Sequence, residues 1–285
     1  MIDIHSHILP HMDDGSVSLE MSLEMARQYV NDGVTHVICT PHIMPGVWNN
    51  TVPAIHAAVA RLQDALTENG FPLTVLPGAD NHVAPDFAQQ LSAGKLLPLA
   101  ASKFVLVEPP HQVPYPRILS VFGQVISAGY RPILTHPERL SWINLNYKVL
   151  KDLAALGGLM QVTAGALVGR FGADAKSLGA RMLGDGLVHF IATDCHHPEL
   201  RPANLSEGWR AARDIIGEKQ ADALVLDHPR LILADKPLEL KGSTTRAAEA
   251  EHPVAPSRPD GVQEGAAPSP SSLSRLLRKF NRGQS

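Results

Sequence analysis

The first 240 residues of the chain alternate between two hydrophobic periods. Short apolar runs such as 34–40 and 104–107 are typical of buried strands, whereas apolar side chains recur at helical spacing in segments such as 19–31. Strands that alternate with helices form a mainly parallel sheet. At this length the pattern favours a closed or nearly closed β/α barrel, with an open doubly wound sheet as the alternative.

The boundaries of these elements follow from the apolar runs and from Gly and Pro. Strands are predicted at 2–4, 34–40, 73–76, 104–107, 132–135, 159–162 and 188–193. Helices are predicted at 19–31, 53–69, 84–94, 116–127, 147–156, 174–185, 205–217 and 219–226. Pro41 is expected to end the second strand, because proline cannot donate a hydrogen bond to a sheet.

The composition changes near Gly242, after which Ala, Ser, Pro, Gly and charged residues dominate. Such a segment cannot bury enough apolar surface to offset the entropy lost on ordering it. We therefore expect a folded domain at 1–241, a disordered linker at 242–271 and a separate C-terminal segment at 272–285. That segment is either a basic amphipathic helix that contacts a membrane surface or a partner, or a frayed tail.

Charge and cysteine content exclude some classes of protein. The chain has 285 residues and a formal net charge of −3, which argues against nucleic-acid binding through bulk positive charge. Its two cysteines, Cys39 and Cys195, cannot build a disulfide framework, which indicates a reducing compartment. No apolar run is long enough for a transmembrane helix, and the N-terminus lacks the features of a secretory signal. We expect a cytoplasmic protein.

Histidines and carboxylates follow the predicted strands. The side chains in these positions are His5, His7, His42, Asp80, His82, Glu108, His136, Glu138, Asp194, His196 and His197. The carboxyl ends of the strands meet on one face of a barrel, so we expect these residues to converge there. Imidazole and carboxylate groups are ligands of Zn²⁺, Mn²⁺ and iron. The pattern therefore predicts a metal site built from several strand ends.

The individual histidines differ in how they relate to this site. For His82, His111 and His197, three roles stay open: metal ligand, supporting residue or bystander. Five others are expected to lie outside the site, namely His36, His56, His189, His228 and His252.

Short motifs spread over residues 1–240 resemble the polymerase-and-histidinol-phosphatase (PHP) superfamily. The motifs are Asp3 to Pro10 followed by Asp13-Asp14-Gly15, Thr40-Pro41-His42, Pro77 to Asp80, Val107-Glu108, Thr135 to Arg139, and Ala192 to His196. Within the superfamily, the chain is similar to the bacterial manganese-dependent protein-tyrosine phosphatases of capsule and exopolysaccharide loci.

This resemblance implies a distorted (β/α)7 barrel that holds three divalent metal ions, with Mn²⁺ expected and iron or Zn²⁺ as alternatives. Carried over by position, the metal ligands are His5, His7, Asp14, His42, Asp80, Glu108, His136, Asp194 and His196. The implied substrate is phosphotyrosine on an autophosphorylating bacterial tyrosine kinase that controls polysaccharide export. Family members often form small homo-oligomers, but no segment of this chain predicts a number of subunits.

Two positions depart from the family pattern. Asp80 stands where the family usually has Glu; its side chain is one methylene shorter, so either one ion binds more weakly or His82 assists. His11 stands where the family commonly has Gly, and this side chain either tunes substrate entry or faces solvent.

Two arginines are candidates for binding the phosphoryl group. Metal ions would activate water for in-line attack on phosphorus, and nearby cations would stabilise charge on the phosphoryl oxygens. Arg139 closely follows His136 and is the first candidate, and Arg201, which matches a family arginine, is the second. The alternative for Arg139 is an ion pair with Glu138 or another neighbour.

Cys195 and Arg201 also have the Cys-x5-Arg spacing of cysteine-dependent tyrosine phosphatases. However, Pro198 between them has no amide donor, and Glu199 would repel phosphate. No glycine allows the intervening loop to wrap closely around an anion. The metal-dependent reaction is therefore favoured over a thiolate nucleophile.

The favoured function is thus a metal-dependent phosphotyrosine phosphatase. Two alternatives stay open. The same chemistry could act on a small phosphomonoester such as histidinol phosphate, or the protein could be a non-catalytic metal-binding scaffold that regulates polysaccharide assembly.

Overall fold

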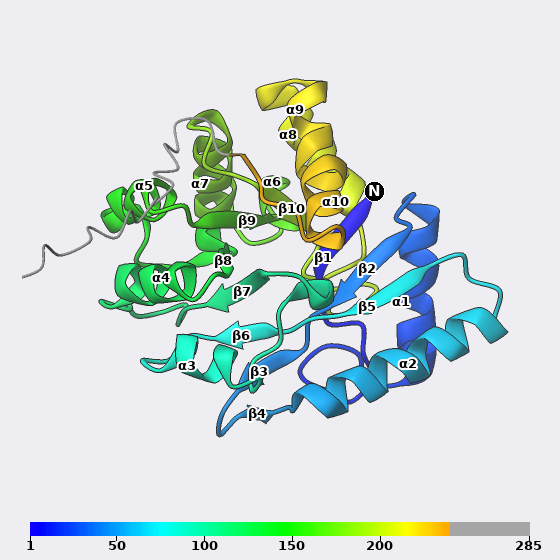
Figure 1. Cartoon of the computed structure of the whole chain (residues 1–285). Helices are drawn as coiled ribbons and strands as arrows, with labels where there is room; N and C mark the ends of the chain where they lie inside the picture. Colours follow the sequence, from blue (N-terminus) through cyan, green and yellow to red (C-terminus); the bar gives the residue numbers. More distant parts are fainter. Residues whose placement is uncertain (240–285) are drawn as a thin grey trace, which may run out of the picture. The chain divides into compact units, whose positions relative to one another are not determined.

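Parallel strands form a ring, and helices pack around it (Figure 1). In this computed structural model the structure describes residues 1–239. β1 (Ile2–Ser6) pairs with β2 (His36–Cys39), and β2 pairs with β5 (Thr74–Pro77), all in parallel. The predicted linker and C-terminal segment, 242–271 and 272–285, lie outside the described residues.

Two of the strands are interrupted and continue into a second sheet. The chain runs from β2 into β3 (His42–Met44), and from β5 into β6 (Asp80–His82). β3 pairs in parallel with β6, and parallel pairing continues in order through β7 (Phe104–Glu108), β8 (Arg131–Thr135), β9 (Leu159–Thr163) and β10 (Phe190–Ala192). When each interrupted strand is counted once, the ring consists of seven strands: β1, β2–β3, β5–β6, β7, β8, β9 and β10.

The segment after β10 returns to β1 and closes the ring. Ser6 forms an isolated parallel bridge with Cys195. The amide of Asp194 donates to the carbonyl of His5, and the amide of His7 donates to the carbonyl of Cys195, each over 2.9 Å. The predicted barrel is therefore confirmed, and the open doubly wound sheet is wrong.

The helices connect successive strands along the outside of the ring. They are α1 (Leu19–Asn31), α2 (Val52–Glu68), α3 (Phe87–Ser92), α4 (Ile118–Ser127), α5 (Lys148–Ala155), α6 (Ala164–Leu167), α7 (Ala173–Gly184), α8 (Leu205–Ile216), α9 (Glu218–Asp222) and α10 (His228–Leu233). Short 3-10 turns are η1 (Leu99–Ala101), η2 (Pro137–Arg139) and η3 (Asn144–Asn146). The hydroxyl of Ser18 caps α1 by accepting a hydrogen bond from the Met21 amide, which is why this helix starts where the sequence predicts.

Three predicted elements differ from those observed. Pro41 interrupts the second strand instead of ending it, because β3 begins at the next residue and forms a hairpin with β4 (Trp48–Asn49). The strand predicted at 188–193 is confined to β10. The last predicted helix, 219–226, is split into α9 and the π-helical turn η4 (Ala223–Asp227).

Alternate residues of each strand divide between two apolar cores. Leu106 and Ile133 belong to a core inside the ring, whereas their neighbours Val105 and Leu134 pack in the larger core with the helices. This division is expected because successive side chains of a strand point to opposite faces. Polar side chains replace apolar ones at the carboxyl ends of the strands, and they form the upper layer of the interior.

A bulge in β1 changes the direction of its side chains. Three residue steps separate Asp3 from Ser6, whereas only two separate their partners in β2, Val37 and Cys39. An extra residue moves the side chains that follow it to the other face of the strand. Ile4 can therefore pack in the inner core while the next residue, His5, faces the interior of the same ring.

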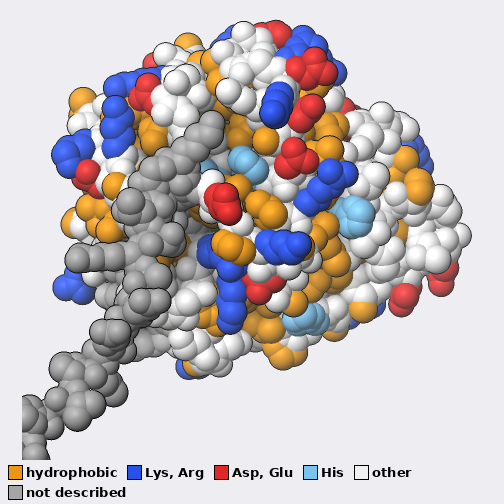
Figure 2. Space-filling model, turned by 45° about the horizontal axis from the view of Figure 1, so that its top comes forward, with side chains coloured by type: hydrophobic (Ala, Val, Ile, Leu, Met, Phe, Trp, Pro, Cys, Tyr) orange, Lys and Arg blue, Asp and Glu red, His pale blue; other side chains and the backbone are white. Residues whose placement is uncertain are grey.

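The surface carries charges of both signs. On the face shown in Figure 2, Lys and Arg side chains are interspersed with Asp and Glu, with apolar side chains between them. Within residues 1–239, none of the helices is both long and apolar enough to cross a membrane.

Candidate metal centre

The residues predicted as metal ligands converge at the carboxyl ends of the strands. They come from β1 and the loop after it (His5, His7, Asp14), from the starts of β3 and β6 (His42, Asp80), from the end of β7 (Glu108), and from the segments after β8 and β10 (His136, Asp194, His196). Eight of them fall in overlapping groups whose ligand atoms lie within 4.8 Å of one another, and the ninth, Asp194, contacts three members of these groups. The roles of these residues as ligands stay predictions.

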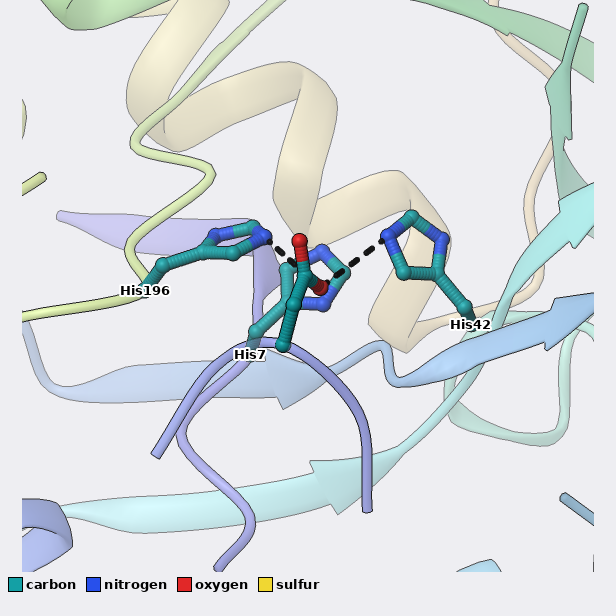
Figure 3. Close-up of side chains that lie close together, drawn as sticks. His7, His42 and His196 are labelled. Atoms are coloured by element: carbon teal, nitrogen blue, oxygen red, sulfur yellow. Dashed lines mark ion pairs between the residues drawn. The ribbon is translucent and has the colours of Figure 1, made fainter. Parts of the chain in front are cut away.

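The first group consists of three histidines around one carboxylate (Figure 3). Asp14 Oδ1 lies 3.5 Å from His42 Nε2 and 3.4 Å from His196 Nε2. The ring of His7 packs between these two histidines, 4.6 Å and 3.8 Å from their ring centroids. Three nitrogen donors and one oxygen donor around a common centre suit a divalent transition metal.

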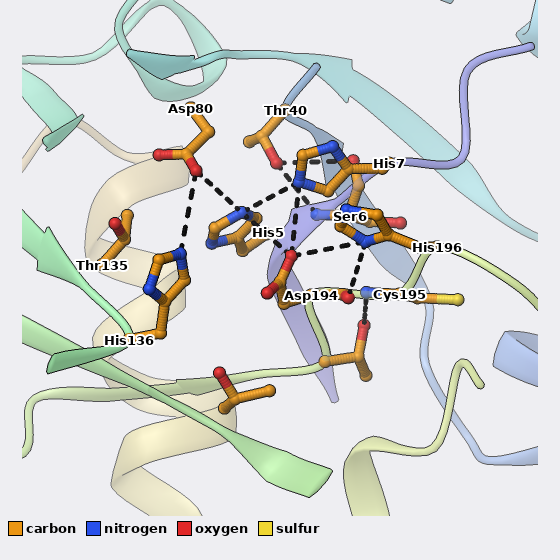
Figure 4. A network of polar contacts seen from close by, with 12 residues as sticks. His5, Ser6, His7, Thr40, Asp80, Thr135, His136, Asp194, Cys195 and His196 are labelled. Carbon is orange, nitrogen blue, oxygen red and sulfur yellow. Dashed lines mark hydrogen bonds and ion pairs between the residues drawn. The ribbon is translucent and has the colours of Figure 1, made fainter. Parts of the chain in front are cut away.

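A second group lies deeper in the ring, around His5 (Figure 4). The Nε2 atoms of His5 and His7 face each other over 3.2 Å, and His5 Nε2 lies 3.5 Å from Asp80 Oδ2. Asp194 Oδ1 lies 3.3 Å from the Nε2 atom of each histidine. Ring nitrogens and carboxylate oxygens thus converge on one point.

A third group surrounds Glu108. Glu108 Oε2 lies 3.3 Å from His42 Nδ1, and Glu108 Oε1 lies 3.3 Å from His111 Nε2. His136 Nε2 lies 3.9 Å from Glu108 Oε1 and also 3.9 Å from Asp80 Oδ2. Glu108 therefore links the group that contains His42 and Asp80 to the group that contains His111 and His136.

Several buried atoms in and beside these groups have no hydrogen-bond partner. They are both carboxylate oxygens of Asp80, the Nδ1 atoms of His42, His82 and His136, and Nε2 of His111. Unpaired buried polar atoms are rare in folded proteins because each costs free energy. Coordination of divalent cations would satisfy atoms of this kind, so the residues present fit a metal centre.

Electrostatic interactions in the cluster shift its pKa values in both directions. Burial lowers the pKa of His7, but the Asp13 carboxylate outweighs this effect and raises that pKa to about 9. Burial and repulsion by Glu108 raise the pKa of Asp80 well above its usual range. Burial and the charge of Arg139 hold the pKa of His136 well below its usual range. Protons and metal cations therefore compete for the same atoms.

Asp13 is a supporting residue that the sequence did not assign to the site. Its Oδ2 lies 2.6 Å from His7 Nδ1 and accepts the backbone amide of His42 over 3.0 Å, while its Oδ1 accepts the amide of Gly15 over 2.9 Å. A hydrogen bond to Nδ1 leaves Nε2 of His7 free to bind metal. A Cβ atom on Gly15 would lie 2.2 Å from the His7 carbonyl oxygen, so this close turn requires glycine. The motif Asp13-Asp14-Gly15 was the feature of the sequence from which this role could have been predicted.

Gln161 and Asp3 also hold the deep part of the site. Gln161 Oε1 lies 2.9 Å from Nδ1 of His5 and orients that ring. The buried carboxylate of Asp3 accepts hydrogen bonds from the hydroxyl of Tyr29 and from the amide and hydroxyl of Thr193, which ties β1 to β10. Burial raises the pKa of Asp3 to about 6 despite these hydrogen bonds.

Two predicted ligands have left-handed backbone conformations. His136 has φ of 33° and Asp194 has φ of 51°. Such conformations are uncommon for residues other than glycine and cost free energy, and they concentrate at functional sites. Both residues follow directly or closely on a strand, where a sharp turn directs the side chain back towards the ring.

Both candidate arginines reach the metal cluster. Arg139 and Arg201 each donate to Oδ2 of Asp194. The predicted alternative, an ion pair of Arg139 with a neighbour, thus occurs, but its partner is Asp194. Glu138 instead accepts the backbone amide of Thr163 over 2.9 Å and is buried.

The other histidines fall into two sets. His82 and His111 contact Glu108, with His82 Nδ1 at 3.6 Å from Oε2, so both belong to the cluster. His197 lies outside it, because its Nδ1 accepts the amides of Glu199 and Leu200 within its own loop. His11 is exposed and has φ of 61°, a backbone conformation that explains why glycine suits this position.

The histidines predicted to lie outside the site are arranged accordingly. His36 begins β2 at the opposite end of the ring, and His56 lies in α2. His228 contacts the carbonyl of His189 just before β10. His252 lies outside the described residues.

The thiol of Cys195 is buried away from solvent. Burial raises its pKa well above the usual range, and the negative charge of Asp3 adds to this effect. A thiol of this kind is a poor nucleophile, because the reactive form is the thiolate. The structure therefore argues against the cysteine-dependent reaction.

A seven-stranded barrel with a cluster of histidines and carboxylates at the carboxyl ends of its strands defines a metal-dependent hydrolase of the PHP type. The family model described as "Capsular polysaccharide synthesis, CpsB/CapC" matches residues 1–234. The chain belongs to this family, as its motifs predicted.

Relatives of known name support this assignment. The chain is 37% identical over 207 residues to the tyrosine-protein phosphatase YwqE of Bacillus subtilis. These residues make up 73% of this chain and 82% of YwqE. It is 30% identical to the putative tyrosine-protein phosphatase CapC of Staphylococcus aureus. The matched residues make up 73% of this chain and 81% of CapC.

Solved structures show the same fold. One reported for YwqE of Bacillus subtilis and CpsB of Streptococcus pneumoniae, described as metal-dependent tyrosine phosphatases, has a TM-score of 0.81 and 33% identity. That match covers 84% of this chain and 96% of the other. Histidinol phosphate phosphatase of Lactococcus lactis matches with a TM-score of 0.51 and 15% identity, a likeness that concerns the fold alone.

Proposed function

We propose that this protein is a metal-dependent protein-tyrosine phosphatase. The observation that carries the proposal is the convergence of the histidine and carboxylate cluster with two arginines at the mouth of one barrel. The family assignment and the names of the relatives support the same activity.

Three divalent ions would be held by the three groups of side chains. The first would use Asp14, His42 and His196, and the second His5, His7, Asp80 and Asp194, because Nε2 of His7 can bind only one ion and lies 3.2 Å from Nε2 of His5. The third would use Asp80, Glu108 and His136, together with His111, which is not in the ligand set implied by the resemblance. When bound, such ions activate water near neutral pH and polarise the phosphoryl group. Mn²⁺ suits this nitrogen and oxygen set, as do iron and Zn²⁺.

The two arginines would bind the phosphoryl oxygens. A guanidinium group is always charged and can form two parallel hydrogen bonds with phosphate. Asp194 holds both guanidinium groups at the edge of the cluster, so they are positioned before substrate enters. Charge that develops on the phosphoryl oxygens would be stabilised without reorganisation of either side chain.

The substrate we propose is phosphotyrosine on an autophosphorylating bacterial tyrosine kinase that controls capsule or exopolysaccharide synthesis. The family to which the chain belongs is described by capsular polysaccharide synthesis, which supports this setting. The cytoplasmic location, the membrane contact of residues 272–285 and a homo-oligomeric state stay predictions from the sequence.

A comparison of substrates tests the proposed function. The full chain loaded with Mn²⁺ should hydrolyse a phosphotyrosyl peptide with a kcat/KM far above that for a phosphoseryl peptide of the same sequence and for histidinol phosphate. Equal or higher kcat/KM for histidinol phosphate would replace the proposed substrate by a small phosphomonoester. Absence of hydrolysis of all three, with metals bound, would favour the non-catalytic scaffold.

A further inference from the structure

The aromatic ring of Phe171 lies against both arginines of the site. The guanidinium carbon of Arg139 lies 4.4 Å from the centroid of this ring, and that of Arg201 lies 5.6 Å from it. Both distances are within the range of about 6 Å in which a cation is attracted to the face of an aromatic ring. The two arginines come from different loops, after β8 and β10, and Phe171 comes from a third loop, after β9.

The loop that carries Phe171 is anchored on both sides. Arg170 forms two hydrogen bonds of 2.8 Å with the carboxylate of Glu207 on α8, and its backbone amide donates to Gly165 over 2.9 Å. Gly165 packs against this loop: a Cβ atom there would lie in tight contact, 3.1 Å, with the Arg170 side chain and in ordinary contact, 3.4 Å, with Phe171 Cε2. Phe171 is therefore set in place by its surroundings.

The loop that carries Arg139 is tied to the same structure. The buried carboxylate of Glu138 accepts the amide of Thr163, the last residue of β9 and the N-cap of α6. α6 leads directly into the loop with Phe171. The backbone positions of Arg139 and of the aromatic ring are thus linked through Glu138.

We propose that Phe171 is a positioning residue, which holds the guanidinium groups of Arg139 and Arg201 side by side at the mouth of the site. Asp194 alone would leave both cations free to pivot about one carboxylate oxygen, since each donates to the same Oδ2 atom. The ring adds a second point of contact for each guanidinium and excludes water from one side. This inference rests on the proposed function, in which the two arginines bind the phosphoryl group.

The test compares variants of Phe171 in the full chain loaded with Mn²⁺. Phe171→Leu removes the aromatic face, and kcat for a phosphotyrosyl peptide should fall about 3- to 30-fold, the range expected for one or two cation–π contacts. Metal content should change little, and kcat should fall by a larger factor than KM rises. Phe171→Tyr keeps the aromatic face and should retain most of the parent kcat.

A fluorinated phenylalanine at position 171 separates electrostatics from packing. Fluorine withdraws electron density from the face of the ring while nearly preserving its shape, so it weakens attraction to a cation. This variant should also lose kcat, by no more than Phe171→Leu does. The matched control is the same replacement at Phe104, whose ring lies 5.0 Å from the guanidinium of Arg131 at the other end of the ring of strands, and it should leave kcat unchanged.

Binding of inorganic phosphate gives a readout that does not need turnover. Calorimetry should show that the fluorinated variant binds phosphate more weakly than the parent, by about the 3- to 30-fold expected for kcat. If the parent binds phosphate in this way but hydrolyses no phosphotyrosine, the proposed function falls and the role of Phe171 stands. Parent-like kcat and phosphate affinity in Phe171→Leu would overturn the inference, and so would a rise in KM alone, which would place the ring against the substrate.

Discussion

Replacement of Asp13 by asparagine tests how much of the metal site depends on a residue outside the predicted ligand set. The carboxylate accepts three hydrogen bonds, from His7 Nδ1 at 2.6 Å, from the His42 amide at 3.0 Å and from the Gly15 amide at 2.9 Å. An asparagine has one carbonyl oxygen, so an amide N–H must replace one of the two acceptor atoms. It also removes the negative charge that makes His7 a stronger ligand.

Loss of such a supporting carboxylate typically lowers metal affinity about 10- to 100-fold, or about 1.4 to 2.7 kcal/mol. We expect the Asp13→Asn variant to lose affinity in this range for the ion bound by His5 and His7. Competition with a fluorescent chelator measures the Kd, and Asp32→Asn is the control. Asp32 accepts one amide hydrogen bond, from Ser206 over 2.8 Å, away from the site. A metal affinity within twofold of the parent, or a loss equal to that of the control, would refute the reasoning.

Four further predictions follow from the site. Arg139→Ala should keep its metals, and its kcat should fall about 10²–10³-fold, the usual effect of removing one hydrogen-bond donor that stabilises transition-state charge. Metal analysis and kinetics on the same sample test this, and loss of metals would show that Arg139 has a structural role instead. Cys195→Ser should retain most activity, whereas a phosphocysteine trapped by acid quench would establish the thiolate reaction. Asp80→Glu should stay active and bind its weakest ion at least as tightly, and a metal titration that showed severalfold weaker binding would mean that the site is built around Asp80. Metal affinity should rise with pH and level off near pH 9, because His7, whose pKa is raised to about 9, must lose a proton to bind metal; Kd values that do not change between pH 6 and 9 would contradict this.

The order of strands and helices could be predicted because hydrophobic period is a local property of the sequence. The helix predicted at 19–31 is observed with those bounds, since Ser18 and Gly33 mark its ends. The hairpin of β3 and β4 could not be predicted, because His42–Met44 is a strand only through its pairing with the separate segments β4 and β6. The bulge in β1 depends on the register with β2, which no local pattern encodes.

The candidate site divides in the same way. Eight of the nine predicted ligands follow predicted strands, and parallel strands in a barrel bring their carboxyl ends together. Asp14 was predicted only from the resemblance to the PHP superfamily. Gln161 and Phe171 could not be assigned, because their roles arise from contacts with distant segments. Asp13 contacts the nearby His7 and lies in the Asp-Asp-Gly motif, which was a signal that the prediction did not use. The shared ion pair of Arg139 and Arg201 with Asp194 likewise joins loops after β8 and β10.

The most direct test of a metal-dependent phosphatase is to count the metal ions and measure phosphotyrosine turnover on the same sample. Elemental analysis of the purified full chain should find three divalent ions per chain. Chelation should remove these ions together with the activity, and added Mn²⁺ should restore both, whereas His136→Ala should show neither full metal content nor recovery. Unchanged turnover after the ions have been removed would contradict the account.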